Sequence, residues 1–560
     1  MKDEGQLLVV SQYPDSLLAT VTDYFDYNAI LFSLLHSIVF LRVAGVVLLL
    51  GSSALLAFGF SRWLKLNSVV GSVPAFSLWL FCTIGSLFHY CYWCSTINYN
   101  TYNAVASSSA LGMVFLALAP LSENSSKNHL CGFWSMFACG IFIGFEFFIK
   151  FPSAILMAGI CGLLACLSSE SWQTKGRLLF YFVAGFLMWC ALHFLFIRSV
   201  ASVFRSALIN LSAQNALGHN ANLISHYIHD VSRILGEDAC VYWPIFLAVT
   251  IAFMIAEGMR VSSFCPRNFL LLVIVSSFIG TIALAEQNGQ AWEKTIFSGG
   301  YAAVYCVWFL LFAWIGALSL LYFREKKWPE LHWKALFKGG VTCGAVTFAA
   351  AIGTSNAIYI NLVLNLGPWF CLLALMLLII ARLHAQALIY FAGVSAVGIL
   401  AVVQIIAGAF SPFDLKADMF HQTVLTQVGF PVTPLKLDSE TSRFCIDLRK
   451  LFYQNGFRPG DDVLAFYRMP SIIYIIGGRS PGTPWYLGSI VEGGNAYDDI
   501  YLSLCSVERL KKAFIIEDET CAPDHPNLRR YGLDFPGSYT LCGSLVIPQD
   551  QRKIFIWKPN

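Results

Sequence analysis

The chain has 560 residues, of which 57% are hydrophobic and only 12% are charged, against a soluble norm of about 25% charged. A soluble chain of this length would divide into several domains with charged surfaces. The net charge of +3 is spread thinly, without a basic stripe, which argues against nucleic acid as a partner. Composition therefore predicts an integral membrane protein whose first partner is the lipid bilayer.

Apolar runs long enough to cross about 30 Å of hydrocarbon recur from position 39 to position 410. We expect an α-helical polytopic membrane protein with about 12–13 transmembrane helices, in which residues 1–410 form the membrane domain. Charge, Pro and Gly return at ordinary density in residues 411–560, which we expect to form a small soluble α/β domain. The runs lie near 39–60, 68–92, 104–121, 131–148, 152–168, 178–197, 241–257, 268–286, 301–323, 339–353, 364–382 and 386–410.

Lys and Arg are unevenly shared between the loops, and the richer set is expected to face the cytoplasm. With an even number of spans, residues 1–38 and 411–560 then both lie outside. This predicts a bacterial inner (cytoplasmic) membrane protein with its C-terminal domain in the periplasm. The richer set holds Arg62, Lys65, Lys127, Lys175, Arg177, Arg260, Arg267, Arg324, Lys326, Lys327, Lys334, Lys338 and Arg382. The poorer set holds Lys150, Arg198, Arg205, Arg233 and Lys294.

The beginning of the sequence does not fit this topology easily. Met1-Lys2-Asp3-Glu4-Gly5 opens with charge, and no apolar core of a signal peptide follows. We favour a preceding helix that the sequence lacks, which would bring the count to thirteen. A short tail translocated by the first span is the alternative.

Two extracytoplasmic segments, 1–38 and 198–240, carry apolar residues at three- and four-residue spacing. This spacing is typical of helices that lie flat in the membrane interface. Two such helices on one face of the membrane would roof a cavity between the spans. An enzyme whose substrate sits on a lipid carrier needs such a shape.

Ionisable residues inside a membrane are costly, so each is a functional hypothesis. Glu146 and Lys150 lie one helical turn apart at the outer end of a span. Either they neutralise each other, or Lys150 faces the cavity and binds an anionic head group such as a lipid phosphate. Glu286 is an interface residue or a cavity carboxylate, and Arg42 begins a span where its side chain can snorkel to the head groups.

His226 and His229 share a probable helix face, but only Asp230 lies near enough in sequence to help bind a metal. We therefore expect a polar helix face rather than a metal site, and the sequence leaves open whether the protein uses a divalent metal as cofactor. Four cysteines fall in the exported domain, where oxidation is permitted, and they allow three pairings. They are Cys445, Cys505, Cys521 and Cys542.

The C-terminal domain alternates strand-like and helix-like segments. We expect strands at Val463–Tyr467 and Ile472–Ile476, a helix at Val507–Lys512 that leads into Ala513–Ile516, and a closing pair of strands at Ser544–Ile547 and Ile554–Trp557. Gly477–Trp485 is a turn-rich loop that lacks the spacing of a phosphate-binding loop.

Several short motifs are similar to those of multi-span glycosyltransferases of superfamily C (GT-C), which include protein O-mannosyltransferases and lipid A aminoarabinose transferases. Asp3-Glu4-Gly5 resembles their acidic signature, and Phe40-Leu-Arg42-Val-Ala-Gly resembles their Arg-containing entry to the next span. Phe148-Ile-Lys150-Phe-Pro152 resembles a Lys-containing turn of bacterial members. Gly353–Asn361, ahead of Leu366-Gly-Pro368-Trp369, is similar to an outer loop of other bacterial members.

The resemblance implies transfer of a sugar from a polyprenyl-phosphate donor to a hydroxyl of a glycan, lipid or protein acceptor, for cell-envelope glycan or glycoconjugate synthesis. Asp3 would be the general base, and Glu4 would orient the acceptor or share that role. Lys150, with Arg198 or Arg205, would neutralise the leaving phosphate. A solvated terminal charge is the alternative interpretation of Asp3. Glu146, Glu286, His226 and His229 are further cavity candidates.

Three other functions remain open. A lipid-linked glycan polymerase acts on the same kind of substrate, and the sequence separates it poorly from a transferase. A transporter or flippase usually shows internal repeats, and none is visible here. A non-catalytic assembly protein would explain the exported domain without membrane carboxylates.

Overall fold

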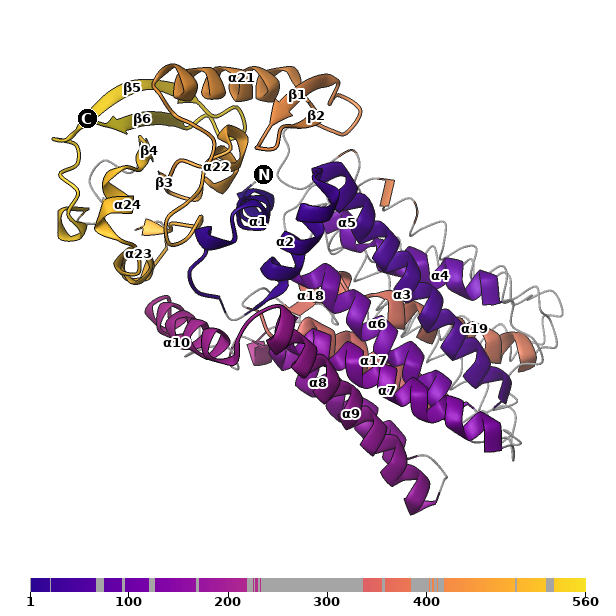
Figure 1. Ribbon diagram of the computed structural model, residues 1–560. Coiled ribbons are helices and arrows are strands. Elements are labelled where there is room, and N and C mark those ends of the chain that lie inside the picture. Colours follow the sequence, from indigo (N-terminus) through magenta and orange to yellow (C-terminus); the bar gives the residue numbers. More distant parts are fainter. Residues whose placement is uncertain are drawn as a thin grey trace.

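The computed structural model describes residues 2–20, 22–66, 75–92, 96–119, 126–167, 171–218, 336–354, 358–383, 417–488, 491–519 and 528–560, together with 225, 227–229, 232, 402, 405–406 and 410. Within these residues the chain forms a helical bundle and a small α/β unit at one end of it (Figure 1). The predicted spans near 241–323 and 386–410 fall almost entirely outside the described residues.

Four helices of the described residues are long and apolar enough to cross a membrane, and the chain is therefore an integral membrane protein. They are α3 (Ile38–Leu66), α6 (Tyr99–Leu118), α7 (Ser126–Ile149) and α9 (Trp172–Phe196). Shorter apolar helices pack beside them: α4 (Ala75–Leu87), α8 (Phe151–Cys166), α17 (Val341–Ala351) and α19 (Gly367–Leu383). The runs predicted for these segments are confirmed as helices.

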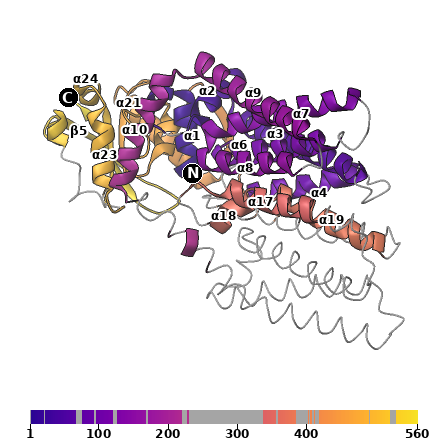
Figure 2. The same cartoon turned by 90° about the horizontal axis from the view of Figure 1, so that it is seen from below.

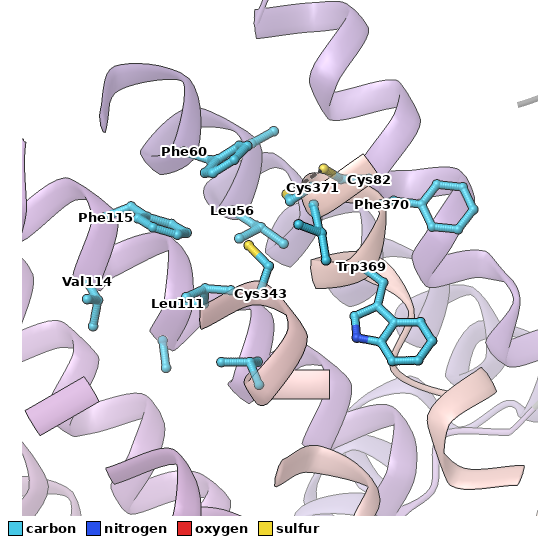
Figure 3. Close-up of a cluster of buried hydrophobic side chains, with 14 of the residues drawn as sticks. Leu56, Phe60, Cys82, Leu111, Val114, Phe115, Cys343, Trp369, Phe370 and Cys371 are labelled. Carbon is cyan, nitrogen blue, oxygen red and sulfur yellow. Dashed lines mark hydrogen bonds between the residues drawn. The ribbon is translucent and has the colours of Figure 1, made fainter. Parts of the chain in front are cut away.

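Glycine pairs let the long helices approach one another closely. A Cβ added to Gly59 of α3 would lie 2.1 Å from the Gly112 carbonyl oxygen of α6, and one added to Gly140 of α7 would lie 2.0 Å from the Phe182 carbonyl oxygen of α9. Small residues at helix contacts are the usual solution in lipid, where the hydrophobic effect does not draw helices together. A buried apolar cluster joins α3, α4, α6, α17 and α19, with Phe60, Phe115 and Trp369 among its large side chains (Figure 3).

The C-terminal unit is built on a four-stranded sheet with the order β3-β4-β6-β5. β3 (Val463–Phe466) and β4 (Phe514–Asp518) are parallel, whereas β6 (Lys553–Pro559) pairs antiparallel with β4 and with β5 (Tyr539–Val546). A separate hairpin joins β1 (Val424–Val428) and β2 (Thr433–Leu437). The helices are α21 (Ser439–Gln454), α22 (Pro470–Ile476), α23 (Gly494–Ser503) and α24 (Val507–Lys511).

The prediction of a strand at Ile472–Ile476 is wrong, because these residues form most of helix α22. Pro470 occupies the first turn of the helix, and Gly477 closes it in the left-handed conformation at φ 75°. The segment is buried throughout, and a continuous apolar run cannot distinguish a buried strand from a buried helix. The strands expected at 463–467, 544–547 and 554–557, and the helix at 507–512, are confirmed to within a few residues.

The N-terminal residues contribute to the core of the C-terminal unit. Helix α1 (Lys2–Gln12) packs against α22, and its Leu7–Val10 share an apolar core with Phe444 and Ile473. Further along, Leu18 N donates to the Gly482 carbonyl, and the Tyr501 hydroxyl donates to the Ala19 carbonyl. Figure 1 shows α1 between the α/β unit and helix α2 (Tyr24–Leu35).

Candidate functional site

The acidic start of the chain is held where α1, the bundle and the C-terminal unit meet. Arg42 of α3 donates to both carboxylate oxygens of Glu4, with its Nη2 2.8 Å from Oε1 and 2.9 Å from Oε2. The Thr96 hydroxyl donates to the same carboxylate. A Cβ on Gly5, the next residue, would overlap Ser471 of α22 at 2.3 Å, so α1 packs closely against α22 at this point.

The carboxylate of Glu4 is arranged to stay ionised. Burial raises its pKa, but the Arg42 guanidinium and the hydrogen bonds from Thr96 and Arg42 outweigh burial and hold the pKa below its usual value. The backbone of Asp3 lies in the first turn of α1, and its side chain is outside the described residues. The structure therefore brings together Glu4 and Arg42, two residues that the sequence motifs had singled out separately.

A second acidic cluster lies between α2 and the C-terminal end of α9. Asp23 Oδ1 accepts a hydrogen bond of 2.6 Å from Arg198 Nη1, and Asp23 Oδ2 lies 2.9 Å from Nε2 of His193. The other ring nitrogen of His193, Nδ1, is 2.9 Å from the Tyr27 hydroxyl. The His193 ring is fully buried and stacks on Phe148.

Asp26 forms the accessible edge of this cluster. Its carboxylate lies 3.9 Å from Arg198 Nη1, and the side chain is 30% exposed. Desolvation raises the pKa of Asp26 to about 6, although the Arg198 charge opposes the shift. A carboxyl group with such a pKa can accept a proton near neutral pH, which suits a general base.

Sequence reasoning identified Arg198 but missed Asp23, Asp26 and His193. The acids were present as Asp23-Tyr-Phe-Asp26, at a spacing that places both on one side of a helix start. His193 was visible as an ionisable residue near the C-terminal end of an apolar run. Their meeting depends on α2 lying against α9, which is a tertiary contact that no local pattern encodes.

Glu146 and Lys150 are buried at the junction of α7 and α8, and their charged groups do not form an ion pair with each other within 4 Å in the described structure. Glu146 Oε1 accepts from the Ser107 hydroxyl at 3.1 Å, and Oε2 has no hydrogen-bond partner among the described residues. The Lys150 ammonium donates to the Ala350 carbonyl at 2.7 Å.

The Ala350 carbonyl is also the acceptor for two neutral side chains. Asn103 Nδ2 lies 2.8 Å from it, and the Ser153 hydroxyl lies 3.3 Å from it. Three donors from α6, the α7–α8 corner and α8 therefore converge on the last turn of α17, where the helix dipole favours a cation. The contact between Lys150 and a donor phosphate stays a prediction.

The remaining predicted site residues are spread more widely. Arg205 is exposed on α10 (Val200–Ala216), and His229 is exposed beyond that helix. His226 and Glu286 lie outside the described residues, as does Cys521, while Cys445, Cys505 and Cys542 are free thiols. Over the described ranges, no group of three His, Cys, Asp or Glu side chains is placed to hold a metal ion.

No protein-family model matches the chain, and no curated protein sequence matches it either. Among solved structures, the chain is similar to the archaeal oligosaccharyltransferase AglB from Archaeoglobus fulgidus in complex with an inhibitory peptide and a dolichol-phosphate. The TM-score is 0.40, the identity is 13%, and the match covers 93% of this chain and 66% of that one.

A second structure of the Archaeoglobus fulgidus oligosaccharyltransferase, tethered to an acceptor peptide through a disulfide bond, matches with a TM-score of 0.43 and 13% identity. That match covers 92% of this chain and 64% of the other. The chain thus spans less than two thirds of the length of either structure.

Proposed function

We propose that the chain is a membrane glycosyltransferase that moves a sugar from a polyprenyl-phosphate donor to an acceptor hydroxyl at the outer face of the membrane. The observation that carries the proposal is the ion pair between Glu4 and Arg42. These residues belong to two motifs that resemble GT-C enzymes and are 38 positions apart. Their contact brings the two motifs together between α1 and α3, next to the C-terminal unit.

In this proposal Asp3 is the general base. It takes the proton of the acceptor hydroxyl while the hydroxyl oxygen bonds to the anomeric carbon, and the bond from that carbon to the phosphate oxygen breaks. The polyprenyl phosphate leaves with the electron pair and gains negative charge, which a nearby cation stabilises. Glu4 is fixed by Arg42 and Thr96, so it acts by positioning the first turn of α1 and the acceptor.

Arg198 and Arg205 are the cations that we propose for the donor phosphate, with Lys150 as a third. Arg198 is partly exposed beside Asp26, and Arg205 is exposed on the next helix. Asp23 accepts from Nη1 of Arg198 and Ser202 accepts from its Nη2, which fixes the guanidinium in place, and we propose that its positive charge attracts the donor phosphate. In the same proposal, the acceptor is a glycan, lipid or protein of the cell envelope.

Mass spectrometry of lipid-linked sugars and envelope glycans in a deletion strain tests the function. We expect the polyprenyl-phosphate sugar to accumulate and one sugar to be missing from an acceptor glycan. Wild-type protein and the surface control Asp447→Asn should restore the glycan, whereas Glu4→Gln should not. An unchanged set of lipid-linked sugars and acceptor glycans in the deletion strain would contradict the proposal.

A further inference from the structure

Helix α10 has two faces with opposite properties. Val200, Phe204, Leu208 and Leu211 recur at four- and three-residue spacing and are exposed by 48%, 67%, 66% and 50%. This spacing places them on one side of the helix. On the other side, Ser206, Asn210 and Ala213 are buried. Large apolar side chains in such a row need a partner, because leaving them in water is unfavourable.

The buried face of α10 is fastened to the C-terminal unit and to the N-terminal segment. Asn210 Nδ2 donates to the Tyr501 hydroxyl of α23 at 3.3 Å, and the Ser206 hydroxyl accepts from Thr20 N at 2.8 Å. Ala213 packs in one apolar cluster with Leu487 and Tyr501. These contacts therefore attach α10 to the α/β unit.

The corner between α9 and α10 is fixed as well. Arg198 lies in this corner, and its guanidinium donates to Asp23 at 2.6 Å and to the Ser202 carbonyl at 3.3 Å. Ser199 caps the start of α10 by accepting from Ser202 N. Figure 2 shows α10 running across the direction of α9, so a membrane crossed by α9 would have α10 lying along its surface.

The exposed stripe follows directly along the chain on the exposed apolar end of a candidate membrane span. Leu195 and Phe196, at the outer end of the candidate span α9, are exposed by 74% and 76%. Only three residues separate them from the start of α10.

We propose that α10 is the membrane-surface dock of the C-terminal unit. Its apolar stripe enters the boundary between head groups and acyl chains of the outer leaflet, while its polar face carries the α/β unit at a fixed height above the bilayer. The partner is a phospholipid surface. This inference stands apart from the proposed function, because it requires no substrate.

Photo-crosslinking in nanodiscs of phosphatidylethanolamine and phosphatidylglycerol tests the proposal. The photoreactive residue p-benzoylphenylalanine is placed at position 204 or 208 of the full chain, and adducts are identified by mass spectrometry. Position 195 on α9 is the lipid-facing control. Position 446, where Ile446 of α21 is 56% exposed, is the water-facing control.

We expect phospholipid adducts at 204, 208 and 195, in yields that agree within a factor of about three, and at least tenfold fewer at 446. Two positions are used so that one poorly folded variant does not decide the result. Adducts at 195 without any at 204 and 208 would overturn the proposal. Crosslinks from 204 or 208 to a second copy of the chain would also overturn it, because the stripe would then be a protein interface.

Discussion

Arg42 and Glu4 form a two-pronged ion pair that joins α3 to α1, with Nε 3.1 Å from Oε1 and Nη2 2.9 Å from Oε2. Arg42 is 33% exposed and Glu4 is 15% exposed, so the pair is partly screened by solvent. The geometry is nevertheless the bidentate one in which Arg differs most from Lys.

Replacing Arg42 by Ala should lower the free energy of unfolding by about 2 kcal/mol at pH 6, because the Glu4 carboxylate loses its counter-charge. The free energy of unfolding of Arg42→Lys, which keeps the positive charge but loses the planar guanidinium, should lie between the values for wild type and Arg42→Ala. The pKa of Glu4 is depressed in the folded protein, so the pair stabilises the fold above 4.5, the unfolded value, and its contribution is lost as the pH falls through the folded pKa. Thermal melts of wild type and Arg42→Ala at pH 6 and pH 4 measure this loss of stability. Equal stability of wild type and Arg42→Ala at pH 6 would contradict it.

Asp26 should show the opposite pH dependence. Its pKa is raised from 3.8 to about 6, so the protonated group supports the folded state fully below 3.8, and this support is lost as the pH rises through about 6. Asp26→Asn should therefore stabilise the protein at pH 8 by about 1–2 kcal/mol, after allowance for solvent screening, and change little near pH 3.5. Intrinsic tryptophan fluorescence reports the unfolding midpoint, with Asp447→Asn as the surface control. A lower midpoint of Asp26→Asn at pH 8 would refute the expectation.

Much of the architecture could be predicted from sequence, because apolar runs of membrane length have few alternatives in lipid. The helices α3, α6, α7 and α9 and the closing strands β5 and β6 followed from local patterns. Helix α22 was predicted to be a strand, because a short buried apolar run has no periodicity that distinguishes a helix from a strand. The packing of α1 into the C-terminal unit could not be predicted, because Leu7–Val10 and Ile473 are distant in sequence and share only their apolar character.

The candidate site was predictable only in part. Charge near the ends of apolar runs drew attention to Arg42, Lys150 and Arg198, because charge is rare in this chain. Glu4 was identified through the resemblance of its short acidic motif. Which groups meet depends on helix packing. Lys150 was expected to face Glu146 or a cavity, yet its ammonium binds the Ala350 carbonyl, 200 residues away.

Glu146 and Lys150 should prove energetically coupled although they are not an ion pair at contact distance. Glu146→Gln and Lys150→Met each leave one buried charge uncompensated, and each should destabilise the protein by about 3 kcal/mol. The double variant should be closer to wild type than the sum of the two changes, as a double-mutant cycle of thermal melts would reveal. Additive effects would show that the two groups do not interact.

The same lysine tests its predicted contact with the donor. Ser153→Ala removes another donor to the Ala350 carbonyl without removing a charge. If Lys150 also binds the donor phosphate, Lys150→Met should raise the donor KM at least tenfold, whereas Ser153→Ala should not. Equal donor KM values in the two variants would limit Lys150 to holding α17.

The C-terminal unit should lie on the outer side of the cell membrane. The ends of α3, α6, α7 and α9 that face it, near Ile38, Tyr99, Ile149 and Phe196, belong to the loops poor in Lys and Arg (Figure 1). A membrane-impermeant thiol reagent should label Cys505 and Cys542 in intact spheroplasts. The exposed Cys131 and Cys166, near the opposite helix ends, should be labelled only after permeabilisation. The reverse pattern would invert the topology.

Sugar transfer by Asp3→Asn tests most directly whether an acid in the first turn of α1 removes the acceptor proton. The variant keeps the size of the side chain and removes its basicity, so the rate of transfer from the polyprenyl-phosphate donor should fall by roughly two to four orders of magnitude. The thermal midpoint should match that of wild type, and Asp447→Asn should transfer at the wild-type rate. Near-normal transfer by a folded Asp3→Asn protein would contradict the role of Asp3 as general base and leave Asp26 as the next carboxylate to test.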